Sequence, residues 1–136
     1  DVYKRQLGER VGLAFQIQDD LLDLGEGDRT GKPTGQDIRE RKMTLPLIHT
    51  LAKASPSERR RLIRLVKHQS DDAAAVKEVM DAILAGPGME RARSEMRRLK
   101  EESLAMLDEL GGDDAVSREA REALRDLIDY TIKRVK

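Results

Sequence analysis

Residues 15–46 read FQIQDDLLDLGEGDRTGKPTGQDIRERKMTLP, and this stretch decides how the chain is interpreted. Three aspartates, Asp19, Asp20 and Asp23, lie within five residues of one another. Apolar residues recur around them at helical spacing, which predicts a helix over residues 7–25 with the aspartates near its C-terminal end. A chain of zero net charge therefore concentrates acid at one helix end, and something must neutralise it.

The three carboxylates are unfavourable for the stability of the predicted helix. Asp19 and Asp23 stand four residues apart and project from one face, while Asp20 lies about 100° around the helix. Like charges at this spacing repel, and the negative end of the helix dipole disfavours anions. One interpretation is a solvated acidic helix end. The leucines between the aspartates favour another, in which buried carboxylates bind Mg²⁺ together with a diphosphate.

The segment 26–41 is predicted to be a long loop, and loops of this length are often functional. Gly31, Lys32 and Gly35 offer flexible backbone and a positive charge for phosphate, and Lys42 follows ten residues after Lys32. GKPTG is not a nucleotide P-loop, because it lacks a second glycine directly before a Lys-Ser or Lys-Thr pair and no strand precedes it. The segment is therefore a candidate diphosphate site without a nucleotide.

Composition limits the classes of function. The 136 residues suit one domain, and 26 basic residues balance 26 acidic ones, so no overall positive field favours nucleic acid as a partner. No cysteine is present, which excludes thiolate chemistry and suits a reducing compartment, so the cytoplasm is expected. No apolar run approaches the roughly 20 residues of a membrane-spanning helix.

The rest of the chain also predicts helices. Aromatic residues make up only 2%, which disfavours a sheet, and no strand-like alternation occurs. Ser55 opens a capping box, Thr44 is a candidate cap for the helix before it, and glycines mark several helix ends. The predicted fold is all-α, with further helices over residues 44–53, 56–68, 70–86, 89–110 and from 113 or 117 to the C-terminus.

Two segments within residues 12–51 resemble the trans-isoprenyl diphosphate synthases, also called polyprenyl synthetases, in order and spacing. The segments are GLAFQIQDDLLD and GKPTGQDIRERKMTLPLIHTL. The two segments look like that family's second aspartate-rich motif and its Gly-Lys-x-x-Gly-x-Asp loop with the helix start behind it. The C-terminal half is similar to the tail of bacterial long-chain, octaprenyl-type members. The resemblance implies a helical bundle of the isoprenoid synthase type, of which this chain is the C-terminal portion.

The resemblance also implies an activity. It is a Mg²⁺-dependent condensation of an allylic prenyl diphosphate with isopentenyl diphosphate, giving a longer all-trans polyprenyl diphosphate, in a homodimeric enzyme. The metal ions would draw off the diphosphate, so stabilisation of a leaving anion would be the main catalytic effect. Carried over by position, the metal ligands would be Asp19, Asp20 and Asp23, the catalytic residues Asp19 and Lys32, and the substrate-binding residues Phe15, Gln16, Lys32, Asp37 and Lys42.

Some features depart from the family pattern. The family's first DDxxD motif and its isopentenyl diphosphate site cannot be found in the chain, so the fragment alone is expected to be incomplete and inactive. If other helices normally cover it, apolar faces should be exposed. Residues 1–6, DVYKRQ, fit no motif and are interpreted as a non-native leader before a family domain over 7–136. Family members often carry Gly where this chain has Arg41, a change that adds a phosphate contact or faces solvent.

Three alternatives to a synthase remain open at this point. The strongest is a non-catalytic, synthase-like partner subunit that dimerises with an active enzyme, although an intact DDLLD argues against a retired site. A metal-dependent terpene cyclase is disfavoured because GKPTGQD and KMTLP belong to the chain-elongating pattern. A helical bundle without chemistry is the remaining alternative.

Overall fold

The protein is described by a computed structural model that covers residues 2–25, 35–110 and 115–133. These ranges form helices and contain no strand, which confirms the all-α prediction. The helices are α1 (Val2–Asp23), α2 (Gln36–Arg39), α3 (Leu45–Lys53), α4 (Pro56–His68), α5 (Ala73–Ala85), α6 (Gly88–Glu109) and α7 (Ala115–Lys133). None of the described helices is long and apolar enough to cross a membrane.

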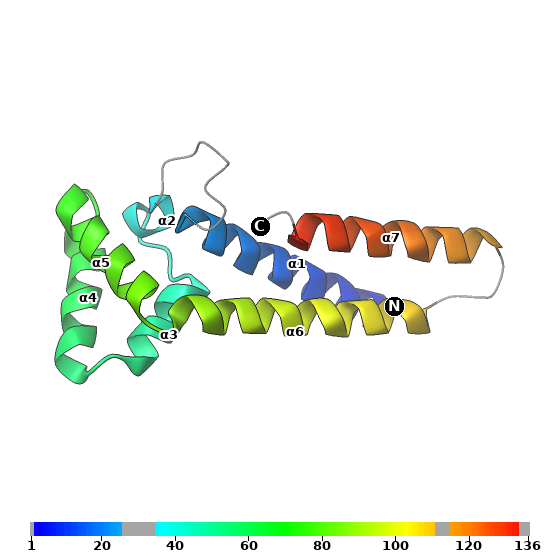
Figure 1. Ribbon diagram of the computed structural model, residues 1–136, viewed down its shortest axis with the longest axis horizontal. Coiled ribbons are helices and arrows are strands. Elements are labelled where there is room, and N and C mark those ends of the chain that lie inside the picture. Colours follow the sequence, from blue (N-terminus) through cyan, green and yellow to red (C-terminus); the bar gives the residue numbers. More distant parts are fainter. Residues whose placement is uncertain (1, 26–34, 111–114, 134–136) are drawn as a thin grey trace.

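Three long helices form the elongated part of the molecule (Figure 1). α1 packs along α6 over most of its length, and α7 lies against both. At the far end from the N-terminus, the shorter helices α3, α4 and α5 gather around the start of α6. The acidic end of α1 therefore lies where the two groups of helices meet, beside the short helix α2.

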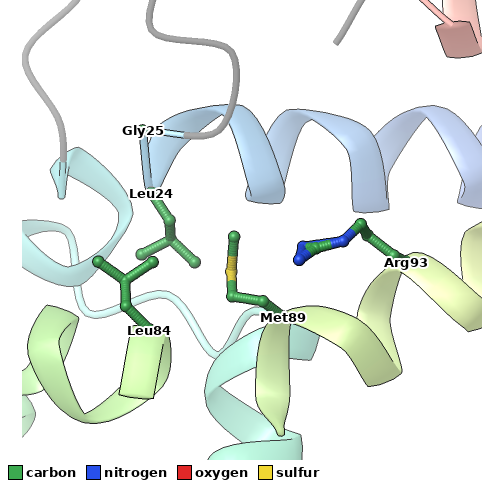
Figure 2. Close-up of a pocket in the computed structure, with 5 residues that line it drawn as sticks. All are labelled: Leu24, Gly25, Leu84, Met89 and Arg93. Atoms are coloured by element: carbon green, nitrogen blue, oxygen red, sulfur yellow. The ribbon is translucent and has the colours of Figure 1, made fainter. Parts of the chain in front are cut away.

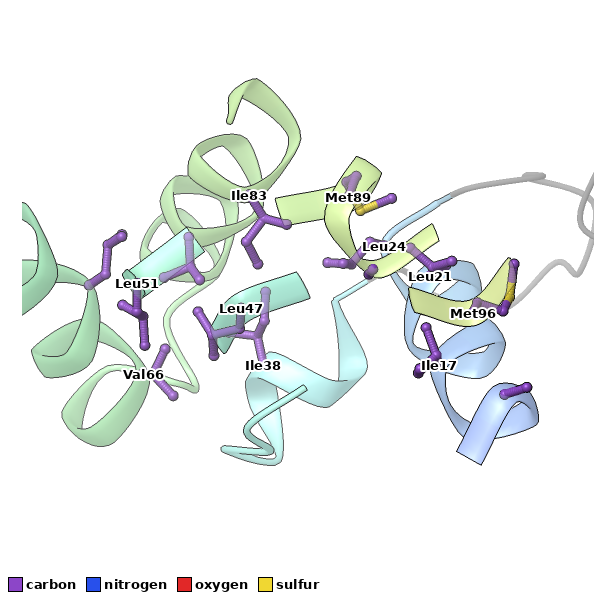
Figure 3. Close-up of a cluster of buried hydrophobic side chains, with 14 of the residues drawn as sticks. Ile17, Leu21, Leu24, Ile38, Leu47, Leu51, Val66, Ile83, Met89 and Met96 are labelled. Carbon is purple, nitrogen blue, oxygen red and sulfur yellow. The ribbon is translucent and has the colours of Figure 1, made fainter. Parts of the chain in front are cut away.

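Aliphatic side chains form one continuous core through both groups of helices (Figure 3). Leu21, Leu47 and Ile83 are almost fully enclosed, and each such side chain contributes roughly 1.5–3 kcal/mol by leaving water. Leu21 comes from the same turn of α1 as the acidic motif. The motif is therefore held by a packed helix, and its position does not depend on a loop.

Two predicted boundaries of secondary structure are wrong. α1 begins at Val2, so residues 2–6 continue the helix, and the Tyr3 hydroxyl donates to the Glu109 carboxylate of α6 at 2.5 Å. Within the predicted loop 26–41, residues 36–39 form α2, while residues 26–34 lie outside the described part of the chain. Glycine at position 25, with a φ of 93°, ends α1 as expected.

The caps of the following helices are partly as predicted. The Ser55 hydroxyl accepts the Glu58 N–H at 3.2 Å and so caps α4, and the Asp72 carboxylate caps α5 by accepting the Ala74 N–H. Thr44 precedes α3, but its side chain makes no capping hydrogen bond. Thr44 therefore occupies the predicted cap position, but the predicted side-chain bond is not formed.

The last helix has a narrower buried face than its apolar spacing predicts. Ile128 and Ile132 are buried, whereas Leu124 and Leu127 are 47% and 56% exposed. The main contacts of α7 are with α1 and α6, and they leave one side of its apolar stripe exposed among the described residues. Leu13 of α1 is 52% exposed as well, so the chain does expose apolar faces.

Gly88 allows the first turn of α6 to lie directly on α3. A Cβ atom at this position would overlap the Thr50 hydroxyl oxygen and lie 2.5 Å from the Pro46 carbonyl oxygen. The Thr50 hydroxyl itself donates to the Pro46 carbonyl at 2.8 Å and is buried, so it has no room to turn away. The close approach of the two helices thus depends on the absence of a side chain.

We expect Gly88→Ala to lower the free energy of unfolding by about 1–3 kcal/mol, because the added methyl group overpacks a rigid contact. Gly12→Ala is the matched control, since a Cβ at Gly12 meets nothing within 4 Å. The control should stabilise α1 by up to about 1 kcal/mol, since Ala is the better helix former. Urea unfolding followed by circular dichroism measures both, and equal effects of the two substitutions would contradict the close-contact explanation.

Arg41 has a φ of 61°, which lies in the left-handed region that favours glycine. Its guanidinium donates to the Ser70 hydroxyl at 3.2 Å, so the side chain has a local partner. We expect Arg41→Gly to be about 0.5–1 kcal/mol more stable than Arg41→Ala, because both lose the bond to Ser70 and only Gly relieves the backbone. Chemical denaturation measures the difference, and an Ala variant as stable as the Gly variant would refute it.

Candidate functional site

The end of α1 gives its three aspartates three different environments. Asp19 is exposed, Asp20 is 6% exposed, and Asp23 is partly buried. Asp20 lies about 100° around the helix from Asp19, whereas Asp19 and Asp23 share a face and differ because the segment that begins α2 lies on Asp23. The predicted burial of the motif is therefore correct for Asp20, partly correct for Asp23 and wrong for Asp19.

The Asp23 carboxylate binds the backbone of the segment that begins α2. Its Oδ1 accepts the Gln36 N–H at 3.1 Å, and its Oδ2 accepts the Asp37 N–H at 3.0 Å. The Asp23 carbonyl oxygen accepts the Gly35 N–H at 2.8 Å. Burial raises the pKa of the Asp23 carboxyl above its ordinary range, against the opposing effect of these backbone donors.

The Asp20 carboxylate fastens the start of α3. It accepts the backbone N–H of Leu45, the first residue of that helix, and also the Gln16 side-chain amide at 3.2 Å. The Leu45 N–H is not the one that a Thr44 hydroxyl would accept, because a capping side chain binds the second or third N–H of a helix. Burial raises the pKa of the Asp20 carboxyl, and the nearby negative charges of Asp37 and Asp19 add to the increase. The local sequence gives no signal for this bond, because Leu45 lies 25 residues along the chain.

Asp37 and Lys42 bring further charge to the same place. The Lys42 ammonium lies 3.4 Å from the Asp37 carboxylate and 3.2 Å from that of Glu40, and the Lys42 N–H donates to the Asp37 carbonyl at 2.9 Å. The hydrogen bond that Lys42 makes with the Glu40 carboxylate, together with the negative charges of Asp37 and Glu40, raises the pKa of Lys42. The Asp37 side chain is 17% exposed, whereas that of Lys42 is 55% exposed. The predicted residues Asp37 and Lys42 are thus in contact.

Gly35 fixes where α2 lies. Its φ of 80° is left-handed, and a Cβ there would lie 2.7 Å from the Met80 sulfur and 3.1 Å from a Val76 methyl carbon of α5. The sequence predicted Gly35 as flexible backbone for phosphate. The structure gives it a packing role instead, because the glycine lets the turn sit directly on α5.

The remaining predicted site residues divide into two groups. Gln16 joins the cluster through its bond to Asp20, and Phe15 packs against the hydrophobic core and is only partly buried. Lys32 lies outside the described residues, so its predicted contact with diphosphate stays a prediction. Within the described ranges, no three His, Cys, Asp or Glu side chains are close enough together to enclose a metal ion.

A hollow of about 350 Å³ opens beside the end of α1. Leu24, Gly25, Leu84, Met89 and Arg93 line it. Figure 2 shows the three apolar side chains converging, with the Arg93 guanidinium pointing toward them. The Arg93 side chain also pairs with Glu90 on its own helix. Among the residues that the structure describes, no predicted metal or substrate residue lines this hollow, although it begins directly after Asp23.

Protonation of the Asp20 carboxylate should make the free energy of unfolding depend on pH. Because the pKa of Asp20 is raised by folding, the folded chain holds more protons than the unfolded chain between the ordinary and the raised pKa. This carboxyl group therefore destabilises the fold above its raised pKa, and the penalty disappears as pH falls below the ordinary value.

We expect Asp20→Asn to raise the free energy of unfolding relative to the parent at about pH 7.5, and the difference to shrink toward about pH 4. The exposed Gln16 amide can turn to match the new side chain. Urea titrations at several pH values measure the effect, with Asp126→Asn at an exposed position of α7 as the control. A difference that does not vary with pH would contradict the assignment.

Comparison with known proteins identifies the family to which this arrangement belongs. Residues 3–83 match the polyprenyl synthetase family. A nonaprenyl diphosphate synthase of Mycobacterium tuberculosis is 38% identical over 133 residues, covering 95% of this chain and 37% of the relative.

Solved structures agree with the sequence match. An apo medium/long-chain prenyl pyrophosphate synthase of Arabidopsis has a TM-score of 0.80 at 28% identity, over 99% of this chain and 44% of that one. A geranylgeranyl pyrophosphate synthase of Corynebacterium glutamicum, complexed with calcium and isoprenyl diphosphate, has a TM-score of 0.76 at 32% identity, over 98% and 40%. The chain thus spans well under half the length of these relatives, and it belongs to the polyprenyl synthetase, or trans-isoprenyl diphosphate synthase, family.

Proposed function

We propose that this chain supplies the second aspartate-rich wall of a prenyltransferase that joins an allylic prenyl diphosphate to isopentenyl diphosphate. The observation that carries the proposal is the cluster at the end of α1, where an exposed Asp19 stands beside buried Asp20 and partly buried Asp23, with Asp37 and Lys42 next to them. Family membership gives this cluster its chemistry. The activity belongs to a protein that also contains the portion of the relatives that this chain does not match.

The donor groups fit a magnesium ion whose coordination shell the protein fills only in part. Mg²⁺ prefers carboxylate oxygens and usually takes one or two of them, with water and phosphate oxygens completing its octahedron. Asp19 is exposed and is the residue we propose as the direct ligand, while Asp20 and Asp23 contribute directly or through water. A relative with calcium and isoprenyl diphosphate, and a second with isoprenyl diphosphate and magnesium, support a divalent metal.

The bound metal would act as a Lewis acid that stabilises the departing diphosphate. Lys42, half exposed beside Asp37, would add a positive charge on the diphosphate side, and Lys32 is proposed for the same role from the sequence. Gln16 and Phe15, each about one turn before Asp20 and Asp19, would face the allylic substrate. We also propose a homodimer for the whole enzyme and a cytoplasmic location, which the lack of cysteine suits.

We expect the chain to bind inorganic diphosphate in the presence of Mg²⁺ and not without it, and Asp19→Ala to weaken this binding at least about tenfold because a metal ligand is lost. Isothermal titration calorimetry measures the affinity. Glu9→Gln is the matched control, because Glu9 is an exposed carboxylate on the same helix. A parent protein that binds no diphosphate at any Mg²⁺ concentration would contradict the proposal and favour the non-catalytic partner subunit.

A further inference from the structure

The carboxylate and carbonyl oxygens of Asp23 all accept backbone N–H groups of one returning segment of the chain. Each of its two carboxylate oxygens accepts one backbone N–H, from Gln36 at 3.1 Å and from Asp37 at 3.0 Å. Its own carbonyl oxygen accepts a third, from Gly35 at 2.8 Å. Three consecutive residues of the returning chain are therefore bound to a single residue at the end of α1.

The segment that Asp23 holds carries charges of the candidate site. Asp37, whose N–H is one of the two donors to the Asp23 carboxylate, lies 3.4 Å from the Lys42 ammonium, and the Lys42 backbone N–H is bound to the Asp37 carbonyl. α2 is only four residues long and does not form enough bonds of its own to be stable alone. Its position must therefore come from its contacts, of which the Asp23 carboxylate is the polar part and the buried Ile38 side chain, with Gly35 close against α5, is the apolar part.

We propose that Asp23 is a positioning residue and not a primary metal ligand. Its carboxylate fixes residues 36 and 37 on the end of α1 and thereby places Asp37, with the Lys42 ammonium paired to its carboxylate, beside the acidic motif. The inference rests on the proposed function, because it assigns these charges to a diphosphate site. Within the motif, Asp19 then binds the metal while Asp23 organises the second segment of the site.

Two conservative substitutions separate positioning from ligation. Asp23→Asn keeps an acceptor oxygen in place for one of the two N–H groups but loses the negative charge. Asp23→Glu keeps the charge that Mg²⁺ prefers but moves the carboxylate by one methylene, away from both N–H groups. A positioning residue is replaced better by Asn, whereas a primary metal ligand is replaced better by Glu.

The first measurement is amide hydrogen exchange at Gln36 and Asp37, by nuclear magnetic resonance in the absence of metal. We expect Asp23→Ala to accelerate exchange at these two amides by about tenfold or more, since each loses a hydrogen bond to a charged acceptor. Asp23→Glu should come close to Ala, and Asp23→Asn should retain part of the protection. Asp81→Asn, at an exposed aspartate of α5, is the matched control and should leave both amides unchanged.

The second measurement is the Mg²⁺ concentration that gives half-maximal binding of inorganic diphosphate. If Asp23 is a positioning residue, this concentration should rise from Asp23→Asn to Asp23→Glu to Asp23→Ala, in the same order as the loss of amide protection. Circular dichroism should show an intact fold in each variant. Wild-type exchange in the Ala variant, or a Glu variant that binds with wild-type Mg²⁺ dependence while Asn does not, would overturn the inference. If the parent binds no diphosphate, the proposed function fails. The order of the amide exchange rates among the Asp23 variants then tests the positioning role by itself.

Discussion

Negative charge at the C-terminal end of α1 is the constraint on which the rest of the structure depends. The helix dipole and the mutual repulsion of the aspartates both oppose it, and burial of Asp20 adds a desolvation cost. Among the described residues, backbone N–H groups from later in the chain offset much of this cost. Asp23 receives those of Gln36 and Asp37, and Asp20 receives that of Leu45.

The same bonds decide the path of the chain after the acidic motif. Residues 35–37 are held against the end of α1, and the first turn of α3 is held one turn earlier on the same helix. Glycines make this path possible, because Gly35 lets the chain touch α5 and Gly88 lets α6 touch α3. Polar bonds and close packing therefore specify a single arrangement, in which Asp37 and Lys42 lie beside the aspartates.

A motif that looks purely catalytic thus also has a structural function. Buried carboxylates are costly unless they are hydrogen-bonded, and here the bonds that satisfy them also anchor neighbouring segments of the chain. The bonds follow burial: the more buried Asp20 and Asp23 hold backbone N–H groups of later segments, whereas Asp19 is exposed. The relatives that share this portion carry names for products of different length, so the shared wall serves several prenyl diphosphate synthases.

The sequence by itself determined the fold class, the family and the residues of the acidic cluster. Helical periodicity and local caps such as Ser55 depend on near neighbours, and a motif is a pattern of nearby residues, so all of them can be read along the chain. Only the tertiary structure decided which aspartate is exposed, that Asp20 binds the first N–H of α3, that Leu124 and Leu127 are exposed, and that Gly35 is needed for packing. The physical reason is that each of these outcomes depends on the presence or absence of a neighbour distant in the chain, which no local pattern specifies.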